Sequence, residues 1–231
     1  MSNFKDERKL WFRAMKKCMK LAVKESKFKY LGEKVTNGAI ILSNHEGASA
    51  PLAFELYSKL PIRFWGTHEM NSGLVKTYKY QTRIYYHQKK HWNLHLARLF
   101  CLLASPLTNL FYKGLNLIST YSDARLRNTI NESICAIKNG QNIVIFPEDS
   151  SKGYKKELPA FHHGCILMMQ QCQKHGIDAP VHLAYYQKET KTFVIDKPVM
   201  ASKLLAQGLS REQLAKQLCD RCNQLGKMQV A

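Results

Sequence analysis

Short apolar segments that run into polar turns are the feature that most constrains the fold of this chain. Five such segments are rich in β-branched and aromatic residues, which is typical of buried strands: 39–44, 62–67, 142–147, 179–186 and 192–196. Segments with helical periodicity separate several of them, at 51–60, 123–139 and 162–176. Strands that alternate with helices predict an α/β fold, with a mostly parallel, covered β-sheet and flanking helices.

Local signals refine this prediction. The helix 51–60 is expected to begin at Pro51, and the helix 123–139 is expected to end at Gly140. Residues 68–112 are predicted to be mostly helical with loops, 115–119 to be a weak strand, and 201–226 to form one or two helices.

The segment 99–112 is strongly apolar but contains Pro106, so we expect a core helix followed by a turn. A lipid-facing or acyl-chain-lining segment is the alternative. Because no uninterrupted apolar run reaches about 18 residues, no helix is expected to span a bilayer on its own.

The N-terminal segment is basic and amphipathic. Residues 1–34 carry eleven Lys and Arg against four Asp and Glu. Trp11, Met15, Cys18 and Ala22 form an apolar stripe at helical spacing, which predicts a helix over 4–24. Such a helix suits an anionic membrane surface, and a helix docked on the domain with a solvated basic back is the alternative. We therefore expect a surface helix in residues 1–27 and one α/β domain in 28–231.

The net charge of the chain favours negatively charged partners. The chain has 231 residues, and its 35 Lys and Arg against 17 Asp and Glu give a formal net charge of +18. This charge attracts nucleic acid, anionic lipids or phosphorylated substrates. No recognition motif for nucleic acid accompanies it, so we expect no nucleic-acid partner. With no secretory signal, the seven cysteines indicate reduced thiols in the cytoplasm.

Two polar turns hold the candidate chemistry. Asn44, His45 and Glu46 follow the first strand segment, and Pro147, Glu148 and Asp149 follow the segment 142–147. Because ligands bind at the carboxyl ends of parallel strands, a His and a carboxylate at two such ends predict an acid/base site.

In this order, the two turns resemble motifs of the glycerolipid (lysophosphatidate-type) acyltransferases. The sequence NHEGASAP at 44–51 is similar to the family's N-H-x-S-x-x-D-P, and FPEDSSKG at 146–153 is similar to F-P-E-G-T-R-S. The resemblance covers about residues 28–200, with an apparent insertion around 75–95. Ala50 stands where the family has Asp, Thr120 where its second motif has Arg, and Asp149, Ser150 and Ser151 where its third motif has Gly-Thr-Arg.

The resemblance implies a peripheral-membrane acyltransferase on the cytoplasmic side of a membrane. It would move a fatty acyl group from acyl-CoA or acyl-carrier protein to a hydroxyl of a lysophospholipid-like acceptor, with no cofactor and no metal. His45 would be the general base and Glu148 would organise the acceptor. The expected substrate-binding residues are Asn44, Ser49, Phe146, Pro147, Asp149, Ser150, Lys152 and Arg125. Glu46, Glu69, Glu148 and Asp149 are the candidates to replace the missing Asp.

Other functional hypotheses remain open beside this one. A catalytically impaired relative that binds lipid or acyl-thioester is the main alternative, because the motif Asp is Ala50. His87, His91 and His95 have the spacing of a metal-binding helix face, but Lys89 and Lys90 between them would repel a cation. Cys219 and Cys222 have redox spacing, but they lie in a polar helical segment and not after a strand, so a chance pair is the favoured interpretation.

Overall fold

The computed structural model describes residues 8–229, and its centre is one mixed, mostly parallel β-sheet. In spatial order its main strands are β1 (Lys27–Tyr30), β7 (Thr192–Ile195), β6 (Pro180–Gln187), β2 (Ile40–Ser43), β5 (Asn142–Ile145), β3 (Ile62–Thr67) and β4 (Ile118–Thr120). The short β8 (Val199–Met200) pairs with β6. Pairing is antiparallel only where β6 meets β7 and β8. The predicted α/β class with a mostly parallel sheet is confirmed.

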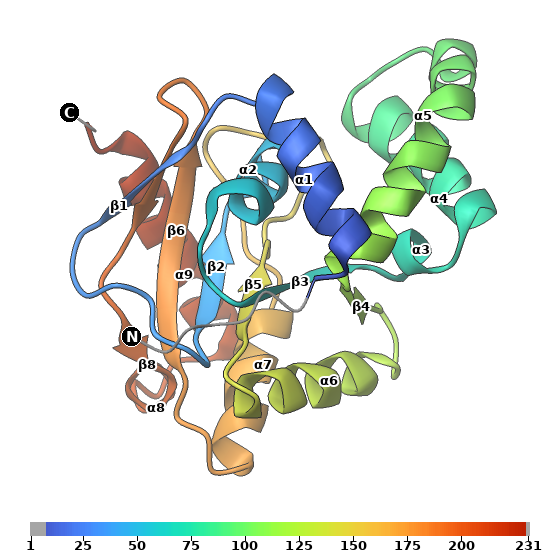
Figure 1. Cartoon of the computed structure of the whole chain (residues 1–231). Helices are drawn as coiled ribbons and strands as arrows, with labels where there is room; N and C mark the ends of the chain where they lie inside the picture. The colour runs from blue at the N-terminus through green and yellow to red at the C-terminus, as the bar shows by residue number, and fades with distance from the viewer. Residues whose placement is uncertain (1–7, 230–231) are drawn as a thin grey trace.

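Helices cover both faces of this sheet (Figure 1). One face packs against α6 (Leu126–Lys138), α7 (Gly164–Lys174), α8 (Ala201–Leu205) and α9 (Arg211–Lys227). The other face packs against α1 (Leu10–Ala22) and α2 (Ser49–Tyr57). Alternate residues of β2 supply the two cores, since Ile40 and Leu42 face the first and Ile41 faces the second. This continuous burial explains the unbroken apolar run of the strand.

A helical extension separates β3 from β4. It comprises α3 (His68–Asn71), α4 (Leu74–Tyr80), the π-helix η1 (Gln81–Lys89) and α5 (Leu94–Leu115). Figure 1 shows α4 and α5 standing to one side of the sheet, with α1 between them and α2. Two buried polar contacts fix the extension internally, from Ser105 to Gln81 at 2.7 Å and from Asn109 to Thr77 at 3.1 Å.

The predicted helix and turn over 99–112 is corrected by α5. The helix continues through Pro106, which is exposed, and it packs against α4 and η1. Most of its leucines face solvent: the α5 apolar face consists of Leu96, Leu99, Phe100, Leu102, Leu103, Leu107 and Leu110, which are 43–81% exposed. Among the described residues, α5 is the one helix long and apolar enough to cross a membrane, judged by length and composition. The expectation that no helix could span a bilayer on its own therefore has to be revised.

The predicted N-terminal helix exists but begins later, and only part of its predicted apolar side docks on the domain. It starts at Leu10, and residues 4–7 of the prediction lie outside the described residues. Of the predicted stripe, Met15 packs against the core, whereas Trp11, Cys18 and Ala22 are exposed. Phe12, next to the stripe, is fully buried beside Phe111 and Gly114. The helix is therefore docked on the domain through Phe12.

Charge pairing reinforces this docking. Arg8 and Lys16 lie 3.0 and 2.8 Å from the two carboxylate oxygens of Glu55, whose side chain is 2% exposed. Because a buried carboxylate is costly without partners, these two cations tie α1 to α2.

Several boundaries differ from the sequence-based expectations. Helix α2 begins two residues before Pro51, α6 begins at Leu126, and β4 starts only at Ile118. Strands β1 and β8 were not predicted. The β1 sequence Lys-Phe-Lys-Tyr has only two apolar residues, and β8 has two residues in all, so neither carries a usable pattern.

The contact between Phe12 and Gly114 predicts a stability effect. A Cβ at position 114 would overlap the Phe12 ring, so Gly114→Ala should lower the free energy of unfolding by about 1–3 kcal/mol. In a Phe12→Ala background the added methyl group has room, and the same change should cost much less. Urea unfolding of the two single variants and the double variant measures this; additive losses would contradict the contact.

Candidate active site

The site lies where two neighbouring parallel strands end. Strand β2 pairs with β5 in the register Ile40–Ile143 and Leu42–Ile145, so the turns after both strands leave at one edge of the sheet (Figure 1). There the backbone N–H of His45 donates a hydrogen bond to Glu148 Oε2, at 3.0 Å. The structure therefore brings together the two residues that the sequence singled out for acid/base chemistry.

A tight turn orients the His45 ring. Glu46 and Gly47 have positive φ angles of 43° and 66°, and this turn places the Gly47 carbonyl oxygen against His45 Nδ1 in a hydrogen bond. A carbonyl oxygen only accepts, so Nδ1 carries the proton and Nε2 is the basic nitrogen. The ring also packs between Phe146 and Tyr154, with centroids 4.9 and 5.1 Å away.

Environment pushes the two titratable groups in opposite directions. Burial lowers the pKa of His45 to about 4, and the positive charges of Lys89 and Lys90 add to this effect. Burial raises the pKa of Glu148 to about 7, against the stabilising hydrogen bond from His45 N–H. Glu148 is 6% exposed, and its Oε1 has no hydrogen-bond partner among the described residues. A neutral imidazole and a carboxyl that titrates near neutrality suit acid/base work.

None of the four candidate carboxylates takes the place of the motif Asp at Nδ1. Glu46 pairs with Lys188 at 3.2 Å, Glu69 contacts Thr67 and His68, and Asp149 accepts from Ser151 N–H at 3.0 Å. Glu148 accepts from the backbone of His45 and not from its ring.

Position 50 itself belongs to the core. Ala50 is fully buried in the apolar cluster that contains Phe54 and Phe64. An Asp there would bury a carboxylate among apolar side chains, so the backbone carbonyl of Gly47 orients the imidazole instead.

Two predicted substrate-binding residues have other partners. Asn44 is buried and exchanges hydrogen bonds with the backbone of Tyr186, at 2.7 and 3.2 Å, so it fastens β2 to β6. Arg125 pairs with Asp123 and lies over the Tyr121 ring in the loop after β4, two strands away from β5. Both residues have these structural contacts, and their roles in substrate binding remain predictions.

The remaining predicted residues stay near the edge. Phe146 packs on His45, Pro147 is buried, Ser49 begins α2, and Lys152 is exposed. Ser150 Oγ accepts a hydrogen bond from Lys89 Nζ at 2.6 Å. Their roles in substrate binding remain predictions.

Sequence reasoning missed the residues that the helical extension brings to His45. Lys89 and Lys90 lie with their ammonium groups 5.3 and 5.5 Å from the centroid of the Tyr154 ring, which itself stacks on His45. The apparent insertion around 75–95 was the only signal. Its two lysines form no motif, and their charge predicts only that a metal ion would be repelled.

The other candidate clusters do not assemble. The chain turns between η1 and α5, with His91 at φ 56°, so His87, His91 and His95 do not share one helix. Within residues 8–229, no group of three or more His, Cys, Asp or Glu could hold a metal ion. Cys219 and Cys222 are free and buried, with their thiols against the carbonyls of Leu158 and Ala184.

Comparisons with known proteins find a likeness in structure but none in sequence. No protein-family model matches the sequence, and no curated protein sequence matches it either. A solved structure of the 1-acyl-sn-glycerophosphate (LPA) acyltransferase PlsC from Thermotoga maritima is similar, with a TM-score of 0.48 and 15% identity. The match covers 89% of this chain and 75% of that chain.

The raised pKa of Glu148 predicts a pH-dependent contribution to stability. Between its usual value of 4.5 and the folded pKa of about 7, the folded state holds a proton that the unfolded state has lost. The contribution of Glu148 to the free energy of unfolding is therefore fully present below pH 4.5 and is lost as pH rises through 7.

Relative to Glu148→Gln, the wild type should lose about 3 kcal/mol of unfolding free energy across this window. Urea unfolding at several pH values measures the difference. The lowered pKa of His45 contributes to the pH dependence of stability with the opposite sign, and His45 is present in both proteins. Exposed Glu157 offers the matched control as Glu157→Gln. A difference that does not vary with pH would contradict the shifted pKa.

Proposed function

We propose that this protein is a peripheral-membrane acyltransferase. It transfers a fatty acyl group from acyl-CoA or acyl-carrier protein to a hydroxyl of a lysophospholipid-like acceptor, with His45 as general base. The observation that carries the proposal is the pairing of His45 with Glu148 at the ends of β2 and β5, with Nδ1 held by Gly47 so that Nε2 is the free base. The motif resemblance of the two turns supports the substrate class.

The mechanism follows from the tautomer of His45. Nε2 takes the proton of the acceptor hydroxyl while the hydroxyl oxygen attacks the carbonyl carbon of the thioester. The C–S bond then breaks, the acyl group remains on the acceptor oxygen, and the thiol leaves with the proton from Nε2. The Nδ1–H bond to Gly47 holds the ring in place throughout. Acyl transfer is direct, so the chain forms no acyl-enzyme.

The environment of His45 limits how well it can act as a base. Its pKa of about 4 keeps it neutral near pH 7 but makes it weak, and no carboxylate at Nδ1 stabilises the imidazolium. In serine-protease triads, loss of the orienting Asp costs about 10⁴ in turnover. A carbonyl at Nδ1 retains the orientation but not the charge, so turnover should be slow unless substrate raises the basicity of His45.

A catalytically impaired lipid-binding relative is the second candidate function. It is favoured by the fully buried Ala50 at the motif Asp position and by Tyr154, which stacks on the His45 ring. Absence of turnover in the wild type with every donor and acceptor tried would favour it.

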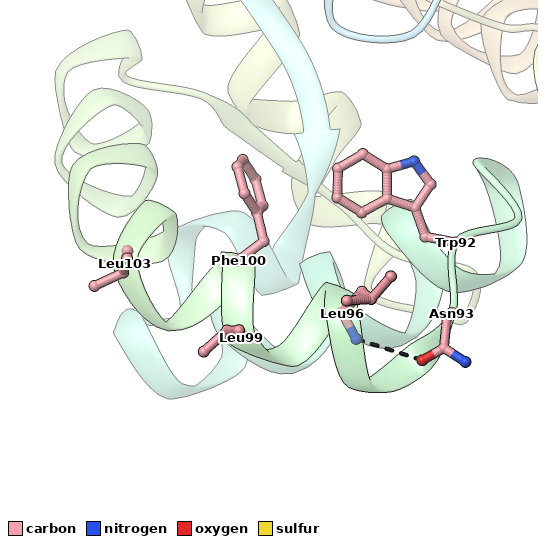
Figure 2. A pocket seen from close by; sticks show the side chains of 6 residues that line it. All are labelled: Trp92, Asn93, Leu96, Leu99, Phe100 and Leu103. Carbon is pink, nitrogen blue, oxygen red and sulfur yellow. Dashed lines mark hydrogen bonds between the residues drawn. The ribbon is translucent and has the colours of Figure 1, made fainter.

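Association with a membrane surface is supported by the α5 apolar face. Figure 2 shows the shallow groove that Trp92, Phe100 and the neighbouring leucines form along the start of α5. Asn93 caps the helix there by accepting from His95 N–H and Leu96 N–H. Residues 74–115 carry seven Lys and Arg and no Asp or Glu. Exposed apolar side chains on a purely basic segment suit an anionic lipid interface.

Exposed apolar residues of α1 also support association with a membrane surface. Leu10 and Leu21 are 80% and 91% exposed, and Trp11 is 39% exposed beside the basic residues of the helix. The seven free cysteines fit a reducing compartment, so we place the protein on the cytoplasmic face of a membrane.

Removal of the imidazole should abolish catalysis. His45→Ala should reduce transfer of labelled acyl groups from acyl-CoA to a panel of lysolipids by about 10²–10⁴, because the imidazole is the proposed base for the hydroxyl proton. His175, exposed at the end of α7, provides the matched control as His175→Ala. Equal activity of His45→Ala and wild type would refute the mechanism.

Membrane binding should depend on the α5 apolar face. Leu99→Ser with Leu103→Ser should weaken binding to anionic liposomes by tenfold or more, since each buried Leu contributes roughly 1.5–3 kcal/mol. Co-sedimentation across a salt series measures this, and rising salt should weaken the wild type as well. Leu209→Ser, at a leucine 40% exposed in the loop before α9, should leave binding unchanged. Unaltered binding of the double variant would exclude α5 as the contact.

A further inference from the structure

Two lysines of the helical extension lie at the acid/base site. Lys89 Nζ donates to Ser150 Oγ at 2.6 Å, and both ammonium groups lie over the ring of Tyr154, at 5.3 and 5.5 Å from its centroid. Lys90 Nζ also lies beside Gly47, only 3.1 Å from where a Cβ would stand. The end of η1 therefore puts two positive charges next to the turn that orients His45.

Neither lysine has a carboxylate oxygen within 4.0 Å among the described residues, although the charges of Glu148 and Asp149 act on Lys89. Among the ion pairs of residues 8–229, none includes Lys89 or Lys90. Lys89 is partly buried, and burial lowers its pKa. Nearby, Glu148 Oε1 is buried without a hydrogen-bond partner among the described residues. A half-buried ammonium without an ion pair and a buried carboxyl oxygen without a hydrogen-bond partner are costly to keep at one place, which is typical of a site that a ligand completes.

We infer that Lys89 and Lys90, with Ser150, form the subsite that binds a phosphate ester of the substrate beside His45. This inference rests on the proposed function and supplies the cations that the motif positions lack. Thr120 and Ser151 stand where the resembled family has arginines, and Arg125 is engaged with Asp123. The chain thus takes its phosphate-binding charges from η1 and not from the turns after the strands.

The chemistry of the groups suits a phosphate. Each ammonium has three N–H donors, and the bond to Ser150 accounts for one of those of Lys89. A phosphate ester presents several charged oxygens, and lysine binds phosphate as a point charge. The face of Tyr154 holds both ammonium groups through cation–π attraction, which positions them without neutralising them.

Occupation of this subsite raises the pKa of His45. The charges of Lys89 and Lys90 lower the pKa of the imidazole, so a bound phosphate that offsets these charges raises that pKa. The substrate would then strengthen the base that acts on it. This coupling gives the proposal a readout that does not depend on turnover.

The first experiment titrates the His45 ring by NMR with and without inorganic phosphate or glycerol 3-phosphate, in the wild type and in Lys89→Gln/Lys90→Gln. In the wild type the ligand should raise the pKa of His45. In the double variant that pKa should be raised already and should no longer respond to ligand. Lys89→Arg/Lys90→Arg should restore the response, and Lys138→Gln, at an exposed lysine ending α6, should behave as wild type. A double variant that responds to phosphate like the wild type would overturn the proposal.

The second experiment distinguishes the two sources of the phosphate. KM is measured for a lysophosphatidate and a monoacylglycerol as acceptors, and for acyl-CoA and an acyl N-acetylcysteamine thioester as donors. Loss of a charged hydrogen bond should raise the KM of the phosphorylated substrate by about 10- to 100-fold in each lysine variant. The phosphate-free counterpart should be unaffected. An equal rise for both members of a pair would overturn the proposal.

The two experiments separate this inference from the proposed function. Lysine-dependent phosphate binding without any acyl transfer supports the subsite and contradicts the enzyme. Acyl transfer with phosphate binding that does not depend on either lysine supports the enzyme and contradicts the subsite.

Discussion

The parallel pairing of β2 between β5 and β6 is the constraint on which the site depends. Two asparagines fix this strand at its ends. Asn142 Oδ1 accepts from Ala39 N–H at 2.8 Å before β2 begins, and Asn44 bonds to the backbone of Tyr186 just after it ends. With both ends held, His45 leaves the sheet directly opposite Glu148. A shift in register would separate the imidazole turn from the carboxyl, so Asn44 supports the position of His45 through the strand.

A backbone carbonyl stands in the role that a carboxylate has in the resembled motif. The Gly47 oxygen fixes the tautomer and direction of the His45 ring, and the left-handed turn at Glu46 and Gly47 makes that contact possible. What a carbonyl lacks is a full negative charge to stabilise an imidazolium. Two nearby lysines deepen that deficit, and together with burial they account for a pKa of about 4. The site is therefore well oriented but short of negative charge.

The sequence sufficed for the elements whose signals are local. Apolar runs and turn residues located the five main strand segments, and the motifs found His45 and Glu148 as neighbours. Signals failed where tertiary contacts decide. Pro106 lies inside α5, which packs against α4 and η1. Phe12 is buried more deeply than any residue of the predicted stripe because Gly114 leaves room for its ring, and Lys89 reaches Ser150 across 61 positions. No periodicity encodes such contacts, and the insertion around 75–95 revealed only that extra chain was present.

The inserted segment links the proposed membrane association to the proposed acyl transfer. One part of it, α5, presents apolar side chains to solvent, while η1, packed against α5, ends in the lysines beside His45. If α5 lies in a lipid interface, the basic end of η1 is held at the level of the headgroups, where phosphate esters are concentrated. An acceptor then meets the lysines before its hydroxyl meets His45, and its charge supplies what the carbonyl of Gly47 cannot. The negative charge missing from the protein at Nδ1 would arrive with the substrate.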